Sequence, residues 1–315
     1  MNERTVTIQS PTGILPVKRN EPLSRYTTFR IGGPADFLVR AATRDDVLAA
    51  LAWADQHQLP VTVIGGGSNL LVGDRGIRGL VVVVRAPSTQ LDDQFRIEPD
   101  GQDHALVTVP AQAPISWLGH ATSAQGLAGL EWTAGLPGVV GGAVVNNAGA
   151  HGGEMADYLV SLTLLDTETF DLVQWTQAML EPRYRMTTLK AAPRPRRWVV
   201  LEVTFRLPYG DRAELQSRVA ELTRWRRVHQ PTGACAGSVF TNPPGTYAGY
   251  LIEQAGLKGL QIGGVKVSER HANFFINTGT ATAADVRALI AMIQEVVQQR
   301  FGIVLVPEIE QIGEE

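Results

Sequence analysis

Cysteine and long apolar runs are scarce in this chain of 315 residues. The single cysteine, Cys235, excludes an intrachain disulfide and a zinc site made of cysteines, and it fits a reducing compartment. The longest apolar runs, such as 80–84 and 139–145, are far shorter than the ~20 residues of a membrane-spanning helix. The first residues also lack the apolar segment of a secretory signal. These absences predict a soluble, cytosolic protein without membrane contact.

Strong charge of either sign is missing as well. The chain has 28 basic and 31 acidic residues, a net charge of −3, which argues against a broad surface for nucleic acid. Charged residues make up only 19% of the chain and hydrophobic ones 44%, so extensive disorder is excluded. The length is about twice the ~150-residue expectation for one domain, and two or three lobes with a sizeable core are therefore expected.

The hydrophobic patterns predict mixed α and β structure. A helix is expected after Thr43, whose side chain would cap it together with Asp46. The other expected helices are Pro114–Gly126, 211–229, Thr246–Ala255 and Thr282–Arg300. The expected strands are Asp36–Val39, Val61–Ile64, Leu80–Val84, Ala105–Val109, Trp198–Phe205 and Ile303–Val306. The region 135–153 is too rich in glycine for ordinary elements and is expected to be mostly loop.

Glycine is over-represented, with 32 residues, and its clusters carry the functional argument. In VTVIGGGSNLLV (61–72), a strand runs into three glycines followed by Ser68 and Asn69. Such a turn can direct successive backbone N–H groups at a phosphate, or it can be a tight turn without a ligand. The Rossmann pattern would need glycine where Leu70 stands, and the Gly-Lys-Ser/Thr of a P-loop is absent.

The second cluster, GLAGLEWTAGLPGVVGGAVVNNAGAHGGEM (126–155), combines many glycines with two adjacent asparagines and little charge. Glycines give the clearance, and amides the hydrogen bonds, that a flat aromatic ring system such as flavin requires. A loop packed beneath a neighbouring lobe would have the same composition. No metal site is expected from the sequence.

Seven motifs in order from Tyr26 to Gly313 give the chain a specific resemblance. They are YTTFRIGGPADF, GGGSNLL, GLEWTAGLPGVVGGAVVNNAGA, YRMTT, AGSVFTNP, LIEQAGLKGLQIGG and VPEIEQIG. In these motifs the sequence resembles the UDP-N-acetylenolpyruvoylglucosamine reductase (UDP-N-acetylmuramate dehydrogenase) family, in its short subclass. The resemblance implies an α+β or α/β fold, with a two-lobed FAD-binding region of the PCMH/vanillyl-alcohol-oxidase type and a smaller α+β substrate-binding lobe. The expected boundaries are 1–84 for lobe 1, 85–209 for lobe 2 and 210–302 for the substrate lobe, with 303–315 returning to lobe 1 or to the site.

The resemblance also implies a reaction. NADPH would reduce UDP-N-acetylenolpyruvoylglucosamine to UDP-N-acetylmuramate through non-covalent FAD, in peptidoglycan precursor synthesis. Three residues match the catalytic positions: Arg185 and Glu308 would stabilise the enolate, and Ser238 would donate the proton. The substrate candidates are Tyr184, Asn242, Gln261 and His229. The expected FAD contacts are Tyr26, Arg30, Ile31, Gly65, Gly66, Gly67, Ser68, Asn69, Thr133, Gly135, Pro137, Gly138, Gly141, Gly142, Asn146, Asn147 and Gly149.

Some positions depart from the family pattern. Met186, Thr241 and Glu310 stand where the family often has other residues, so other residues are expected to bind the phosphates of the substrate and NADPH. The candidates for this positive charge are Arg224, Arg226, Arg227, His229 and Lys258. Cys235 has no matching base and is interpreted as an inert thiol. A monomer is expected. Two alternatives stay open: another FAD oxidoreductase of the same fold, in which a histidine such as His151 could tether the flavin, or a non-catalytic nucleotide-sugar sensor.

Overall fold

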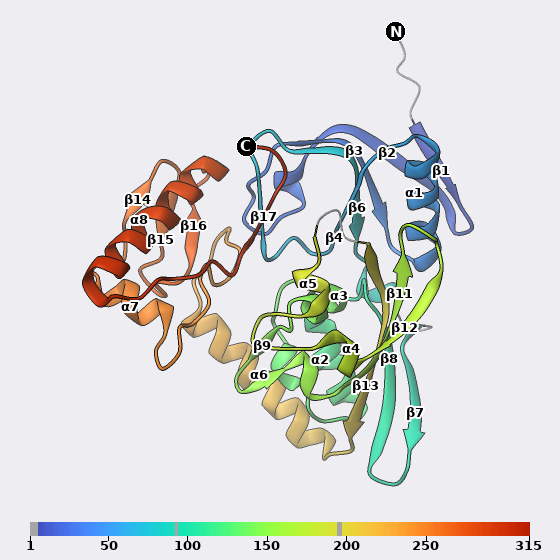
Figure 1. Ribbon diagram of the computed structural model, residues 1–315. Helices are drawn as coiled ribbons and strands as arrows, with labels where there is room; N and C mark the ends of the chain where they lie inside the picture. The colour runs from blue at the N-terminus through green and yellow to red at the C-terminus, as the bar shows by residue number, and fades with distance from the viewer. Residues whose placement is uncertain (1–5, 92–93, 194–196) are drawn as a thin grey trace. The chain divides into compact units, whose positions relative to one another are not determined.

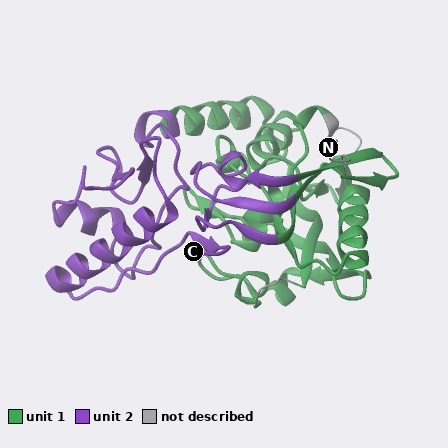
Figure 2. Cartoon of the chain, turned by 90° about the horizontal axis from the view of Figure 1, so that it is seen from above, with its two compact units in different colours: residues 1–18, 38–66, 79–225 green, residues 19–37, 67–78, 226–315 purple. Residues whose placement is uncertain are grey.

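The structure is a computed structural model that describes residues 6–91, 94–193 and 197–315 (Figure 1). The chain divides into two compact units, which Figure 2 colours separately. Unit 1 contains residues 1–18, 38–66 and 79–225, and unit 2 contains residues 19–37, 67–78 and 226–315. The chain thus passes several times between the two units. No helix among the described residues is long and apolar enough to span a membrane.

The N-terminal part of the chain forms a five-stranded sheet with the order β1-β2-β3-β6-β4. Its strands are β1 (Val6–Ser10), β2 (Gly13–Pro22), β3 (Pro34–Ala41), β6 (Ile77–Val84) and β4 (Val61–Ile64). Helix α1 (Arg44–Gln56) begins as predicted: Thr43 and Asp46 form a reciprocal capping box. Asp46 is buried and also accepts hydrogen bonds from Ser10 and Thr12, which fastens the β1–β2 hairpin to the helix.

Unit 1 contains a second, antiparallel sheet with the order β12-β11-β13-β8-β7. Its strands are β7 (Arg96–Asp100), β8 (His104–Pro110), β11 (Leu159–Asp166), β12 (Leu172–Thr176) and β13 (Trp198–Pro208). Val107, Leu162 and Phe205 are buried, alternate with less buried neighbours and meet in one core. The remaining elements of this unit are α2 (Ile115–Ala124), α3 (Val140–Val145), β9 (Gly149–Ala150), β10 (Gly153–Glu154), α4 (Gln177–Leu180), α5 (Thr188–Ala191) and most of α6 (Arg212–His229).

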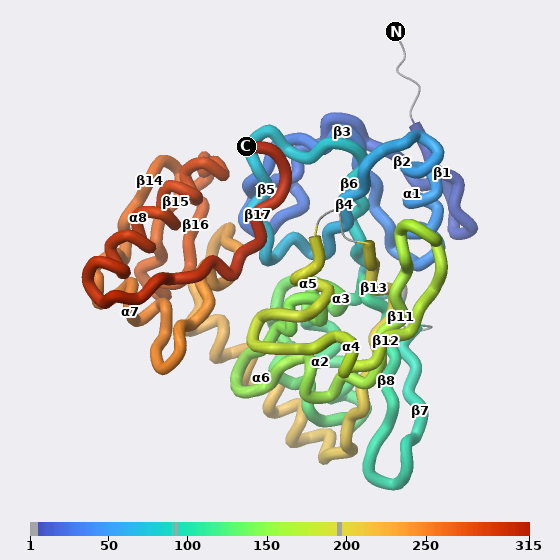
Figure 3. The backbone as a smooth tube through the Cα atoms, in the orientation of Figure 1, coloured from blue at the N-terminus to red at the C-terminus, as the bar shows by residue number. Residues whose placement is uncertain are grey.

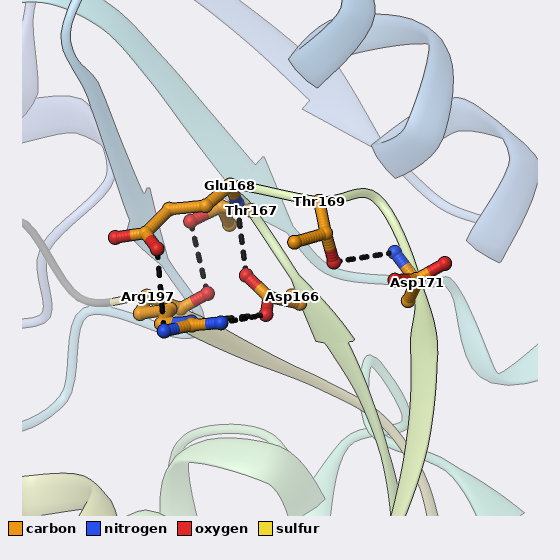
Figure 4. Close-up of polar contacts among 6 residues, drawn as sticks. All are labelled: Asp166, Thr167, Glu168, Thr169, Asp171 and Arg197. Atoms are coloured by element: carbon orange, nitrogen blue, oxygen red, sulfur yellow. Dashed lines mark hydrogen bonds and ion pairs between the residues drawn. The ribbon is translucent and has the colours of Figure 1, made fainter.

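An ion pair joins the ends of β11 and β13 in this sheet (Figure 4). The Asp166 carboxylate accepts from the Arg197 guanidinium at 2.9 Å and 2.5 Å, and from the Glu168 main chain at 2.9 Å. The Arg197 carbonyl accepts in turn from the Thr167 main chain and hydroxyl. The hydrogen bond from Arg197 lowers the pKa of Asp166 to about 2. The Asp166 side chain is only 4% exposed, so this charge is held by its partners and not by bulk water.

Unit 2 packs two helices with a small sheet. Strands β14 (Gln261–Ile262), β15 (Val265–Val267) and β16 (Phe275–Asn277) form the sheet. Helices α7 (Ala248–Gln254) and α8 (Ala283–Phe301) lie beside it (Figure 1). The predicted apolar face of α8 is confirmed, because Val286, Leu289, Ile290, Ile293 and Val297 are all buried. Short 3-10 turns complete the described elements at Leu23–Arg25, Ser88–Gln90, Glu131–Thr133 and Met155–Asp157.

The end of the chain corrects one expectation. The predicted strand Ile303–Val306 is wrong: this segment has no regular element, and Val304 and Val306 are more than half exposed. The following Pro307 has no N–H with which to continue a ladder. The last strand is instead β17 (Glu310–Ile312), which pairs in parallel with β5 (Leu70–Val72), as the trace in Figure 3 shows.

Candidate functional site

Within unit 1, the first two residues of the triple glycine contact the second glycine cluster. An added Cβ at Gly66 would lie 2.6 Å from the Cα of Gly138, and one at Gly65 would lie 2.5 Å from Val139. The approach leaves no room for a side chain at Gly65 or Gly66. The start of the turn after β4 therefore rests on the loop before α3.

The turn itself presents main-chain donors. Gly67 has a φ of +62°, and an added Cβ would overlap the carbonyl oxygen of Tyr26. Within the described residues, the N–H groups of Gly66, Gly67 and Ser68 donate to no protein acceptor. Three consecutive main-chain donors of this kind form a concave nest for an anion. The residues present thus fit a pyrophosphate such as that of FAD.

The glycine-rich loop contains more order than its composition indicated. Helix α3 occupies its middle, and Asn147 follows it with a φ of +40°. The Asn147 side chain is buried, donates to the Arg183 carbonyl at 3.0 Å and accepts from the Ala156 main chain at 3.1 Å. It therefore holds the loop to the segment that precedes Arg185. Thr133 is also buried, and its hydroxyl donates to the Leu130 carbonyl.

Arg185 is oriented by this loop. Its guanidinium donates to the carbonyl oxygens of Gly149 at 2.6 Å and Asn147 at 3.3 Å, both in unit 1. Its main chain has a φ of +56°, a conformation that costs free energy in a non-glycine residue, and Lys190 donates to its carbonyl oxygen. These carbonyl partners fix the direction of the guanidinium. A guanidinium can bind a carboxylate or phosphate through two parallel hydrogen bonds.

The segment 26–33 lies in unit 2 and is anchored to that unit. The Thr28 hydroxyl donates to the Cys235 carbonyl at 2.7 Å, and the Asn277 amide donates to the carbonyls of Phe29 and Arg30. Phe29 and Ile31 are buried in the same core as Phe240. Ile31 thus packs into protein, whereas Arg30, at a φ of +55°, is exposed. The Tyr26 hydroxyl donates to Glu21 at 2.9 Å.

The main-chain segments that carry Ser238 and Glu308 lie side by side within unit 2. The Glu308 main-chain N–H donates to the Val239 carbonyl at 2.7 Å, and Thr241 donates to Val306 at 2.9 Å. These two bonds align the segment after Ser238 antiparallel to the segment that carries Glu308. Both Ser238 and Glu308 are half-buried. The structure therefore places Ser238 and Glu308, 70 positions apart in the chain, on two paired main-chain segments.

The four predicted substrate residues are in different settings. Tyr184 is 52% exposed, and its ring lies 5.2 Å from the Arg185 guanidinium. The Asn242 side chain accepts from the Ala248 main chain at the start of α7. Gln261 is exposed and donates to the Gly263 carbonyl, and His229 is the exposed last residue of α6.

Two residues near Ser238 escaped the sequence analysis. Asn273 is buried and bonds to the main chain of Phe240, and its own N–H donates to Nδ1 of His271. Burial is the main cause that lowers the pKa of His271, with a further lowering from Lys258 and an opposing effect of Glu253. A polar residue inside the apolar run Ala272–Phe275 was the signal that could have identified Asn273.

Burial also shifts the pKa of two further groups, the Arg226 guanidinium and the Cys235 thiol. Burial lowers the pKa of Arg226, a direction expected when a cation loses hydration without gaining a counter-ion. Burial raises the pKa of the Cys235 thiol, so the thiol stays protonated at neutral pH, in agreement with its interpretation as inert.

Comparison with known proteins identifies relatives over almost the whole chain. Residues 35–169 match the FAD binding domain family, and residues 229–312 match the C-terminal domain of UDP-N-acetylenolpyruvoylglucosamine reductase. The reductase of Caldanaerobacter subterraneus is 41% identical over 94% of this chain and 93% of its own. That of Agathobacter rectalis is 40% identical over 99% and 98%. The crystal structure of the Thermus caldophilus reductase has a TM-score of 0.73 at 33% identity, covering 94% of this chain and 98% of its own.

The predicted fold class, α+β with an FAD-binding region, is confirmed.

Proposed function

Because the chain belongs to the UDP-N-acetylenolpyruvoylglucosamine reductase family, it is an FAD-dependent oxidoreductase of peptidoglycan precursor synthesis, and we propose that Arg185, Ser238 and Glu308 carry its chemistry. Its reaction is the reduction of UDP-N-acetylenolpyruvoylglucosamine. When bound, FAD supplies the hydride for the enolpyruvyl double bond. The protein must then manage the negative charge that develops beside the substrate carboxylate, and it must deliver one proton.

Each of the three residues has a distinct task in this proposal. Arg185 pairs with the substrate carboxylate, into which the developing charge spreads. The Ser238 hydroxyl donates the proton to the carbanionic carbon, which is basic enough to accept from such a weak acid. Glu308 holds the enolate region together with Arg185. The observation that best supports this proposal is the 2.7 Å hydrogen bond from the Glu308 N–H to the Val239 carbonyl, because it holds the segments of the proposed proton donor and carboxylate side by side.

FAD is proposed to lie on the glycine-rich main chain. The free donors of Gly66, Gly67 and Ser68 fit its pyrophosphate. The loop 131–153 and the segment 26–33 supply the other proposed contacts. Asn147 in the loop forms hydrogen bonds with protein, and Ile31 in the segment 26–33 packs into the core. Their side chains are therefore proposed to support the main chain that faces the cofactor.

Three finer features belong to the same proposal. NADPH is the proposed co-substrate that reduces the FAD. The substrate diphosphate is proposed to meet the basic end of α6, where Arg226 is a partly buried cation whose lowered pKa reflects lost hydration. A monomer in the cytoplasm is proposed, in keeping with the single cysteine, Cys235.

The test is a visible spectrum of the purified protein in two steps. NADPH is expected to bleach flavin absorbance, and UDP-N-acetylenolpyruvoylglucosamine is expected to restore it without oxygen. Acid precipitation is expected to release the colour, whereas colour that stays with the protein would indicate a tethered flavin and favour an oxidase. A protein that binds the nucleotide sugar but neither bleaches nor recovers would be a sensor and not a reductase.

A further inference from the structure

The N–H and C=O groups of Phe240, two residues after Ser238, form hydrogen bonds with a side chain and not with another main-chain segment. The carboxamide of Asn273 accepts from the Phe240 N–H at 2.9 Å and donates to the Phe240 carbonyl at 2.8 Å. Asn273 is only 3% exposed. One buried amide thus satisfies both polar groups of one residue, as a neighbouring strand would do.

The geometry of the surrounding backbone explains why this side chain is needed. Phe240 forms an antiparallel bridge with Pro307, flanked by the bonds Glu308 N–H to Val239 and Thr241 N–H to Val306. In a bridge of this kind the N–H and C=O of the central residue point to the opposite edge. There Asn273 meets them, and its main chain extends the pairing by accepting from the Val239 N–H at 2.8 Å. The stretch 238–240 is therefore held on both edges.

We propose that Asn273 is a positioning residue for the reaction, which fixes the main chain of Phe240 and thereby the Ser238 hydroxyl relative to Glu308. The inference rests on the proposed function, in which Ser238 donates the proton. Asn273 does not touch the reacting atoms in this assignment. It acts because proton transfer tolerates little displacement: an error of ~1 Å in a reacting group can cost ~10²-fold in rate.

The choice of an amide follows from the pairing. Aspartate has the same shape and can accept from the Phe240 N–H, but it has no N–H for the Phe240 carbonyl, so two acceptors would face each other. Serine is neutral and too short to reach both the N–H and the C=O of Phe240. Asn273→Asp and Asn273→Ser are therefore expected to break the hydrogen bonds along one edge of the stretch 238–240, while the Ser238 hydroxyl is retained.

The experiment uses the full-length FAD-loaded protein and measures the two half-reactions separately by stopped flow. In Asn273→Asp, bleaching by NADPH is expected to stay within ~2-fold of the parent, while recovery on adding the enolpyruvyl substrate slows by ~10²-fold. The solvent isotope effect on recovery is expected to increase, because proton transfer becomes rate-limiting. If Asn273→Asp does not fold, Asn273→Ser is the second variant, with the same expected split. The parent protein is measured first, and a parent that fails to recover would refute the proposed function before any variant is tested.

Two comparisons separate positioning from plain stability. Ile293→Ala, in the buried face of α8, removes packing from the same hydrophobic core but none of the hydrogen bonds of Asn273, and it is expected to lower the melting temperature without the selective slowing. In the Ser238→Ala background, Asn273→Asp is expected to slow recovery by less than a further ~3-fold, because the hydroxyl that Asn273 positions is absent. The proposal would be overturned if Asn273→Asp slowed both half-reactions equally or left recovery unchanged. It would also be overturned if the effects of Ser238→Ala and Asn273→Asp on recovery were additive in the double variant.

Discussion

The side-chain amide of Asn69 donates to the main-chain carbonyl of Glu308 at 3.2 Å, and the Asn69 carbonyl accepts from the Glu310 N–H at 2.9 Å. The residue that ends the triple-glycine turn therefore fixes the backbone on both sides of Ile309. From there the parallel pair β5–β17 continues the alignment. The turn proposed to bind pyrophosphate and the proposed catalytic carboxylate are thus connected through a single asparagine.

This connection predicts a double effect of Asn69→Ala. Loss of this partly buried amide hydrogen bond costs about 1 kcal/mol, so recovery by substrate is expected to slow ~5-fold, together with weaker retention of FAD. Stopped-flow recovery and the ratio of FAD to protein after gel filtration measure the two effects. A variant that retains FAD and recovers at the parent rate would show that this bond has no functional role.

Ser238→Ala is expected to remove only the second half-reaction. Bleaching by NADPH should persist, while recovery by substrate falls by ~10²- to 10⁴-fold, the range of a lost general acid. Ser217→Ala, an exposed serine on α6, is the matched control and should leave both steps unchanged. If bleaching were lost as well, the assignment of the proton donor would be wrong.

Arg185→Lys is expected to lower kcat/KM for the enolpyruvyl substrate by ~10²-fold, since a lysine ammonium cannot pair bidentately with a carboxylate while bonding to the carbonyls of Gly149 and Asn147. Reduction by NADPH should change little. The exposed Arg183, two residues earlier, provides the control Arg183→Lys. Equal effects of the two substitutions would mean that only the local positive charge matters.

Gly66→Ala is expected to disrupt FAD binding by forcing the turn after β4 away from Gly138. Overpacking of this kind costs ~1–3 kcal/mol, which corresponds to at least ~5-fold weaker FAD retention if the strain is relieved by moving the turn. Gly210→Ala, where the nearest atoms are 3.4 Å away, is the control. Titration of the apoprotein with FAD measures both variants, and indistinguishable affinities would contradict the role given to this turn.

The lowered pKa of Asp166 predicts that the free energy of unfolding depends on pH. Its pKa in the folded protein is about 2, against an ordinary value of 3.8, mainly because Arg197 donates to it. The unfolded state therefore binds more protons between these values, so the stabilisation is complete above about pH 3.8 and is lost as the pH falls through about 2. Asp166→Asn should lower the free energy of unfolding at pH 7 more than at pH 3.

Urea unfolding at the two pH values measures this difference. Asp171→Asn alters an exposed aspartate at the start of the next strand (Figure 4), and it is expected to have little effect at either pH. A loss of stability in Asp166→Asn that is independent of pH would mean that the side chain contributes through packing and neutral hydrogen bonds.

The sequence by itself determined the local features. Thr43 with Asp46, and the apolar period of α8, specified their helices because caps and periodicity depend on residues within a few turns. Motifs in order were sufficient for the family. Ile303–Val306 was misjudged because apolar residues indicate a strand only when a partner can supply hydrogen bonds, and the sequence does not show the partner.

Only the tertiary structure decided which distant residues meet. The packing of Gly66 on Gly138, and the pairing of Phe240 with Asn273, depend on the path of the chain between them. The apolar run around Asn273 indicates that the residue is buried, but it does not indicate its partners, because they are main-chain atoms, which every residue has. A buried polar side chain must find such partners, and only folded coordinates show which ones it has found.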